Sequence, residues 1–232
     1  MSIGGAQLFL ATAFVHFMDL RLCPTAATLT ISPMSSHHEI GLTGGIACGK
    51  STLAEGLRAR GWHVIDTDRI AHRLLQPGEE VWKNVVDAFG SSILQPDQSI
   101  DRKVLGRLVF ADPPLRAKLN EITHPAIRTA WQREHEERAR THPTYFLAVM
   151  IPLLFECELE QMFSAVWCVG ASRVTQMNRL QARGLSEKEA AQRLASQMPV
   201  AEKMARSSVA FWGEGTPATL LLQLDQVADR LS

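Results

Sequence analysis

Gly44-Gly45-Ile46-Ala47-Cys48-Gly49-Lys50-Ser51 is the stretch of this sequence that decides its fold. It fits the pattern G-x-x-x-x-G-K-[ST] at every position, and Thr52 extends it. Glycines let the backbone turn its N–H groups inward around phosphate oxygens, and a helix that starts here adds partial positive charge. Lys50 can reach the β- and γ-phosphates, and the Ser51 hydroxyl can bind Mg²⁺. The stretch therefore predicts a nucleoside triphosphate site that uses Mg²⁺.

The motif needs a strand before it and a helix after it, and the flanking residues supply both. Residues 40–43 have the composition of a buried strand end, and residues 51–60 carry apolar side chains at helical spacing. Gly61 suits the position that follows a helix. This context disfavours a glycine-rich turn that matches the pattern by chance.

Length and composition limit the function classes. The 232 residues, 46% of them hydrophobic, suffice for one sizeable core or for one domain with an inserted lid. Lys and Arg together number 24, as do Asp and Glu, so nothing indicates a general nucleic-acid or membrane surface. No C-x-x-C pair occurs, which favours a reduced, cytoplasmic setting. The four cysteines are Cys23, Cys48, Cys157 and Cys168.

Residues 1–38 differ from the rest of the chain. Apart from histidines, Asp19 and Arg21 are their only charged residues. The apolar run 7–18 is too short to span a bilayer, and it lacks the basic region of a signal peptide. We expect 1–38 to be a poorly ordered N-terminal extension of a single domain at 39–232, with Met34 as a candidate start. A short membrane-associated or partner-binding segment is the alternative.

Two aspartates follow a second expected strand. Trp62-His63-Val64-Ile65-Asp66 reads as a buried strand that ends in a carboxylate, and Asp68 comes two residues later. Ligands bind at the carboxyl ends of strands in an open parallel sheet. A carboxylate there can orient Mg²⁺ or take a proton from an attacking hydroxyl, or it can cap the next helix. We assign Asp68 to the chemistry and Asp66 to support, including the metal.

Residues from about 69 to 142 are expected to form a helical region that covers a second substrate. Separate helices are predicted at 80–89, 101–110, 115–122 and 126–140. His124 stands before Pro125, ahead of the last of these helices. It is a candidate for binding the acceptor substrate, and a helix cap or a core contact is the alternative interpretation.

Two further strands set the fold class. The run 145–151 is almost purely apolar, as in a central strand covered on both faces, and 162–169 reads as the next parallel strand. Strands that alternate with helices indicate a doubly wound α/β sheet. Glu156 follows the apolar run, where it could lie near metal-bound water or make a surface salt bridge.

Two helices at about 173–203 are predicted to form a mobile lid. Ser186 and Glu189 fit a capping box at the start of the second helix, and Met198-Pro199 ends it. Arginines there could close over a triphosphate and stabilise the charge of phosphoryl transfer. A solvated basic helix face is the alternative. The arginines are Arg173, Arg179, Arg183 and Arg193.

Over about residues 39–205 the chain resembles the dephospho-coenzyme A kinases. The resemblance combines the loop with the aspartate pair and with segment 152–156 (PLLFE), which together are far more specific than the loop alone. It also includes Gly41-Leu42-Thr43, Ile70-Ala71, His124-Pro125, Gln176, Arg179-Leu180, Arg183 and Gln197.

The resemblance implies a P-loop kinase of the nucleotide-kinase type, with a five-stranded parallel core, a helical acceptor-binding insertion and a helical lid. It implies phosphorylation of the ribose 3′-hydroxyl of dephospho-coenzyme A by ATP with Mg²⁺, the last step of coenzyme A synthesis. Asp68 would then activate the hydroxyl, with Lys50 and Arg183 as its catalytic partners. The ATP site would comprise Gly45, Ala47, Cys48, Gly49, Lys50, Ser51, Thr52, Arg179 and Arg183, the acceptor site Asp68 and His124, and the metal site Ser51 and Asp66.

The chain departs from the family pattern at two places. Ala47-Cys48 stands where the family usually has Gly-Ser, and alanine would be strained if position 47 needs a positive φ. Near the last strand, 207–215 lacks the aspartate and the Asn-Gly pair that the family usually shows. The residues that contact adenine are therefore not assigned.

Two other functions compete with this one. The nearer is another small-molecule P-loop kinase that acts on a nucleoside or nucleotide. The other is a nucleotide switch without acceptor chemistry, although no N-K-x-D guanine-reading motif is present. We expect dephospho-coenzyme A as the small-molecule partner, with no nucleic acid and no membrane, and the oligomeric state stays open.

Overall fold

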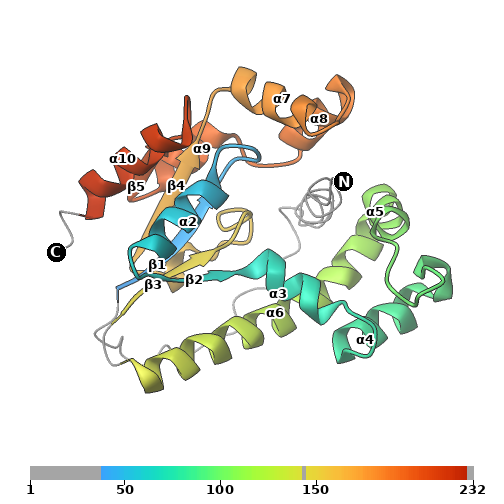
Figure 1. Cartoon of the computed structure of the whole chain (residues 1–232). Helices are drawn as coiled ribbons and strands as arrows, with labels where there is room; N and C mark the ends of the chain where they lie inside the picture. Colours follow the sequence, from blue (N-terminus) through green and yellow to red (C-terminus); the bar gives the residue numbers. More distant parts are fainter. Residues whose placement is uncertain (1–37, 143–144, 229–232) are drawn as a thin grey trace. The chain divides into compact units, whose positions relative to one another are not determined.

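The computed structural model describes residues 38–142 and 145–228, and a five-stranded sheet organises it (Figure 1). The strand order is β2-β3-β1-β4-β5. β1 pairs in parallel with β3 and β4, and β4 pairs in parallel with β5. The predicted doubly wound α/β class is confirmed. The strands are β1 His38–Gly44, β2 His63–Asp66, β3 Phe146–Met150, β4 Ala165–Gly170 and β5 Val209–Trp212.

β1 occupies the centre of the sheet, between the apolar strands β3 and β4. Leu42 lies opposite Met150 of β3 on one side and opposite Trp167 of β4 on the other. All three side chains are buried. Strands covered on both faces read as continuous apolar runs, which is why 145–151 could be recognised from sequence.

Helices α2 (Lys50–Ala59) and α10 (Pro217–Ala228) pack together over the sheet. Leu53 and Leu57 of α2 and Leu224 of α10 are fully buried in the same cluster as Leu42. Because α2 begins where β1 and its loop end, this packing fixes the helix that follows the phosphate-binding motif. The same unit holds η2 Glu160–Met162, α7 Arg173–Ala182, α8 Glu187–Ala195 and α9 Val200–Arg206.

Residues 66–141 form a compact unit with its own core. Buried apolar side chains from α4, α5 and α6 meet there, among them Val85, Leu105 and Leu119. The elements of this unit are α3 Thr67–Leu74, α4 Glu80–Phe89, η1 Ser91–Ile93, α5 Arg102–Ala111 and α6 Pro113–Thr141.

The sequence-based helix boundaries are wrong in this unit. We expected one helix to end near 122 and another to begin after Pro125, whereas α6 runs through Pro125 without a break. Proline removes one helical N–H donor, but α6 packs against α3, α4 and α5, and this tertiary packing outweighs the local loss. Helix α9 was also missed, since only the stop at Met198-Pro199 was predicted there.

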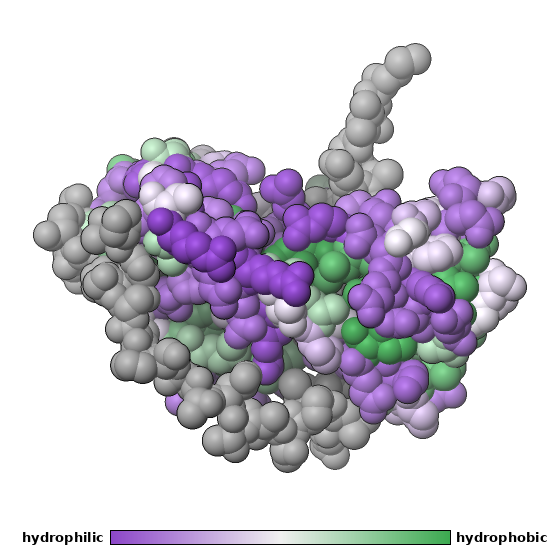
Figure 2. All heavy atoms as spheres, turned by 90° about the horizontal axis from the view of Figure 1, so that it is seen from below, coloured by the Kyte–Doolittle hydropathy of each residue, from purple (hydrophilic) through white to green (hydrophobic). Residues whose placement is uncertain are grey.

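On the face drawn in Figure 2 most of the coloured surface belongs to hydrophilic residues, and hydrophobic residues appear in smaller areas. Within 38–142 and 145–228, none of the helices is both long and apolar enough to cross a membrane. The extension expected at 1–38 lies almost wholly outside the described residues.

A cluster of aromatic rings secures β2 and β3 and yields a stability prediction. Trp62 is 7% exposed, stacks on Phe146 with ring centroids 4.7 Å apart, and lies 5.4 Å from Trp167. We expect Trp62→Ala to cost about 3–5 kcal/mol of unfolding free energy, because it opens a cavity in this cluster. Denaturant unfolding at pH 7 measures this loss.

Trp212→Ala is the matched control, since Trp212 is 45% exposed and its removal should cost less than about 1 kcal/mol. Equal losses in the two variants would show that the aromatic cluster does not carry this stability.

Candidate active site

The phosphate-loop residues join β1 to α2, as the motif requires. Gly49 precedes the first residue of α2 with φ 110° and ψ 16°, a left-handed conformation that favours glycine. The loop is tied to the sheet by Gly45 N–H, which donates to the Val169 carbonyl at 3.2 Å. Ser51 and Thr52 lie in the first turn of α2, and the Ser51 side chain is exposed.

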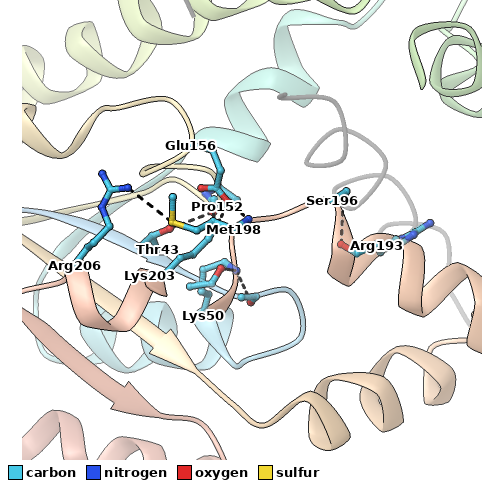
Figure 3. Close-up of polar contacts among 11 residues, drawn as sticks. Thr43, Lys50, Pro152, Glu156, Arg193, Ser196, Met198, Lys203 and Arg206 are labelled. Carbon is cyan, nitrogen blue, oxygen red and sulfur yellow. Dashed lines mark hydrogen bonds and ion pairs between the residues drawn. The ribbon is translucent and has the colours of Figure 1, made fainter. Parts of the chain in front are cut away.

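Lys50 folds back over the loop that precedes it. Its Nζ donates to the carbonyl oxygens of Gly44 and Gly45, both at 2.9 Å. These bonds hold the ammonium group against the loop where the motif places the β- and γ-phosphates. Figure 3 shows this side chain together with the contacts made around it.

Cys48 is fully buried inside the loop. Burial raises the pKa of its thiol, and the nearby charge of Lys50 only partly opposes that rise. The side chain therefore stays a neutral thiol at pH 7 and fills space in the loop as a small residue.

Ala47 adopts a positive φ of 60°, so the strain anticipated from the sequence is present. Helix α7 holds the carbonyls on both sides of this position. Gln176 Nε2 donates to Ile46 O at 2.8 Å, and Arg179 Nη1 donates to Ala47 O at 3.0 Å. A side-chain clamp of this kind stabilises a backbone conformation that alanine alone disfavours.

Arg179 also joins the loop to the segment after β5. Its Nη2 donates to Gly213 O at 2.8 Å, and Gly213 N–H donates to Gly170 O at 2.7 Å. A Cβ on Gly213 would lie 1.9 Å from Cys48 O, so only glycine permits this approach. Arg179, assigned to ATP from the sequence, thus makes two bonds to the backbone that surrounds the loop.

Glu214 is a site residue that sequence reasoning missed. Its carboxylate accepts hydrogen bonds from Ser172 N–H, at 2.6 Å, and from the Thr175 hydroxyl. These bonds lower the pKa of Glu214 and anchor the start of α7 beside Gly213. The available signal was the Gly-Glu-Gly sequence directly after a strand. From the sequence alone, this segment stands out only as a departure from the family pattern.

Arg183 is the C-cap residue that directly follows helix α7, one turn after Arg179. Burial and the nearby charge of Arg179 lower the pKa of Arg183. An anion beside Arg183 would offset both the burial and the nearby positive charge that disfavour its charged form. The predicted capping box at the start of α8 is present, with reciprocal bonds between Ser186 and Glu189.

The two aspartates begin the helical unit. Asp66 Oδ1 accepts from the backbone N–H groups of Asp68, at 3.0 Å, and Arg69, at 3.3 Å, so Asp66 caps α3. This agrees with the supporting role expected for Asp66. Asp68 lies in the first turn of α3, where the helix dipole favours a negative charge.

His124 is part of α6 and does not cap a helix. Its Nε2 is buried and has no hydrogen-bond partner among the described residues. An unpaired buried ring nitrogen agrees with a site for a polar ligand group as well as with a core contact, the two alternatives drawn from the sequence.

The prediction of a surface salt bridge for Glu156, one of the two alternatives from the sequence, is wrong. Its carboxylate pairs with Lys203 at 2.6 Å, and the two side chains are 1% and 0% exposed. The apolar residues around segment 152–156 draw this carboxylate inside, where only a paired charge is tolerated.

Comparison with known proteins identifies the family of the chain. The model of a dephospho-CoA kinase family matches residues 38–216. The chain belongs to the dephospho-CoA kinase family. A dephospho-CoA kinase of Anaeromyxobacter dehalogenans is 45% identical over 190 residues, covering 81% of this chain and 89% of the relative. One of Geobacter sulfurreducens is 44% identical over 189 residues, covering 81% and 95%.

Two solved structures share the fold of this family member. A dephospho-CoA kinase from Campylobacter jejuni is 28% identical with a TM-score of 0.61, covering 84% of this chain and 98% of that one. TT1252 from Thermus thermophilus is 32% identical with a TM-score of 0.72 over the same shares.

The positive φ of Ala47 gives a test of the loop conformation. We expect Ala47→Val to weaken ATP binding by about tenfold or more, because a β-branched residue is a genuine outlier at positive φ. Ala47→Gly should stay within about 1 kcal/mol of the wild type in unfolding free energy. Titration calorimetry and denaturant unfolding measure the two quantities, and unchanged ATP affinity in Ala47→Val would contradict the strained loop.

The lowered pKa of Glu214 gives a pH prediction. A carboxyl with a lowered folded-state pKa stabilises the fold above its unfolded pKa of about 4.3 and loses that contribution as the pH falls through the folded value. Glu214→Gln imitates the protonated form, so its melting temperature should lie below that of the wild type at pH 7. The difference should shrink as the pH falls below about 4.3 toward the folded-state pKa, and a difference that stays constant over this acid range would rule out the carboxylate anchor.

Proposed function

We propose that this protein transfers the γ-phosphoryl group of ATP to the ribose 3′-hydroxyl of dephospho-coenzyme A. The product is coenzyme A, and the step is the last of its biosynthesis. The observation that carries the proposal is the phosphate loop, with Lys50 Nζ held 2.9 Å from Gly44 O and Gly45 O at the start of α2. Membership of the dephospho-CoA kinase family supports the choice of acceptor.

We assign ATP phosphate binding to the loop and to the first turn of α2. Gly45 and residues 47–52 would surround the phosphates, with backbone N–H groups donated from the N-terminal turn of α2. Lys50 would neutralise charge on the β- and γ-phosphates as the terminal group moves. The bonds from Gln176 and Arg179 to loop carbonyls support this, because they fix the loop before ATP arrives.

We assign Asp68 to the acceptor hydroxyl and His124 to binding of the acceptor. Asp68 would orient the 3′-hydroxyl for in-line attack and receive its proton. Because phosphoryl transfer passes through a loose transition state, orientation contributes more than early proton removal.

The lid arginines have separate parts in this proposal. Arg183 would approach the transferred group and stabilise its charge when the lid closes. Arg179 would serve ATP mainly by holding the loop, since it donates to Ala47 O and Gly213 O.

The residues present fit Mg²⁺. This ion keeps several waters and is bound mainly through substrate phosphates, so it needs few protein ligands. The exposed Ser51 hydroxyl lies in the first turn of α2, and the Asp66 carboxylate, which caps α3, is the second oxygen ligand that we assign to the ion. When bound, Mg²⁺ supplies positive charge to the β- and γ-phosphates.

We further propose that the enzyme works in the cytoplasm, without nucleic-acid or membrane partners. The cysteines Cys48, Cys157 and Cys168 are free and buried, which suits a reducing compartment.

The test is ADP release from ATP and Mg²⁺ with and without dephospho-coenzyme A. Acceptor-dependent release supports the proposal. Release with nucleosides or nucleotides alone would favour another small-molecule kinase, and slow release with no acceptor dependence would favour a nucleotide switch.

Two substitutions test the assigned residues. We expect Lys50→Ala and Asp68→Asn each to lower kcat by about 10²-fold or more, because each removes a group that acts on the reacting atoms. Asp87→Asn is the control, since Asp87 is an exposed carboxylate of the same helical unit. Near-normal turnover in Asp68→Asn, with circular dichroism unchanged, would refute the assignment of Asp68.

A further inference from the structure

A buried ion pair lies beside the phosphate loop, and the mechanism above does not use it. Glu156 Oε1 and Lys203 Nζ are 2.6 Å apart, with both side chains almost completely buried. Glu156 stands on the turn after β3, and Lys203 belongs to α9, just after the lid helices α7 and α8. Both residues belong to the sheet unit of the chain.

The pair is the middle of a chain of polar contacts (Figure 3). Lys203 Nζ donates to Pro152 O at 2.9 Å, and Thr43 Oγ1 donates to the same oxygen at 3.2 Å. At the other end, Met198 N–H donates to Glu156 Oε1 at 3.0 Å. Thr43 directly precedes the phosphate loop, and Met198 lies where the chain returns from the lid. The contacts therefore connect the strand that carries the loop to the lid's point of return.

Helix α9 also contacts the loop itself. A Cβ on Gly45 would lie 3.2 Å from Cγ2 of Val200, the first residue of α9. Lys203 stands three residues further along the same helix. A contact that fixes Lys203 therefore also fixes the Val200 side chain, which lies close to Gly45.

Stability alone is a weak reason for such a pair. Taking two charges out of water costs free energy that their attraction often fails to repay, and apolar replacements of similar size are often neutral. The pair makes two hydrogen bonds to the backbone, at Pro152 O and at Met198 N–H. The first of these groups adjoins the strand that carries the phosphate loop, and the second adjoins the lid. In addition, Glu156 Oε2 is buried without a hydrogen-bond partner among the described residues, an unusual cost to retain.

We propose that Glu156 and Lys203 are positioning residues for the phosphate loop. The pair sets the position of α9 and of the lid's return at Met198, and thereby holds Gly45 and the loop in the form that binds triphosphate. The proposal deepens the proposed function, since it concerns the same nucleotide site. Its deciding measurements, nucleotide affinity and amide hydrogen exchange, use nucleotide alone, so it can fail or succeed independently of the acceptor.

The test compares single variants with a neutral double variant. Glu156→Gln leaves the buried Lys203 without its counter-ion, and Lys203→Met leaves Glu156 as an unpaired charge, so both single variants should lower the melting temperature. The double variant Glu156→Gln/Lys203→Met removes both charges at nearly constant volume, while the bond to Pro152 O is lost. We expect it to regain the wild-type melting temperature to within about 3 °C.

Affinity for a fluorescent N-methylanthraniloyl ATP then separates positioning from stability. Positioning predicts that the double variant binds this nucleotide about tenfold more weakly despite its restored melting temperature, with a raised KM for ATP and kcat changed less than threefold. Affinity within twofold of the wild type would overturn the proposal. Glu160→Gln is the matched control, because it removes the carboxylate that pairs with Arg206 at the end of the same helix.

A measurement on the wild-type protein tests the proposal without any variant. Coupling between two sites is reciprocal, so nucleotide binding must stabilise the segment whose position governs it. We expect saturating ATP without acceptor to slow amide hydrogen exchange in residues 196–200 at least threefold. Unchanged exchange there, with slowed exchange in the loop at 44–51, would overturn the coupling.

Discussion

The structure depends on the direction in which the backbone groups of one loop point. Phosphate binding at the start of α2 needs backbone N–H groups, so the carbonyl groups of the loop before it need other partners. Lys50, Gln176 and Arg179 supply them, with bonds of 2.8–3.0 Å to four successive residues, 44–47. The loop is therefore prepared for an anion by side chains that bind its carbonyls, and this arrangement explains how Ala47 can occupy a conformation that usually calls for glycine.

Contacts from the surrounding helices also hold the loop in this conformation. α7 brings Gln176 and Arg179 to the loop and is itself anchored by Glu214 at its first turn. After helices α7 and α8, α9 places Val200 beside Gly45, and the Glu156–Lys203 pair holds α9 to the turn after β3. The chain before and after these two helices is thus bonded to segments that adjoin the phosphate loop.

Local patterns explain which features could be predicted. The phosphate loop, the apolar run of β3, the cap at Asp66 and the capping box at Ser186 are written in neighbouring residues. The uninterrupted α6 and the burial of Glu156 depend on partners far along the chain, so local rules misjudged both. Glu214 was missed for the same reason, because its partners Ser172 and Thr175 lie about 40 residues earlier.

The central claim is that this site carries a phosphoryl group from ATP to one hydroxyl of dephospho-coenzyme A. Phosphorus NMR of the product, formed by the wild-type protein with ATP and Mg²⁺, tests it most directly. The account predicts a new monoester resonance coupled to the ribose 3′ proton, equal in amount to the ADP formed. A spectrum in which ADP is matched only by inorganic phosphate, or in which the ester is at another hydroxyl, would contradict it.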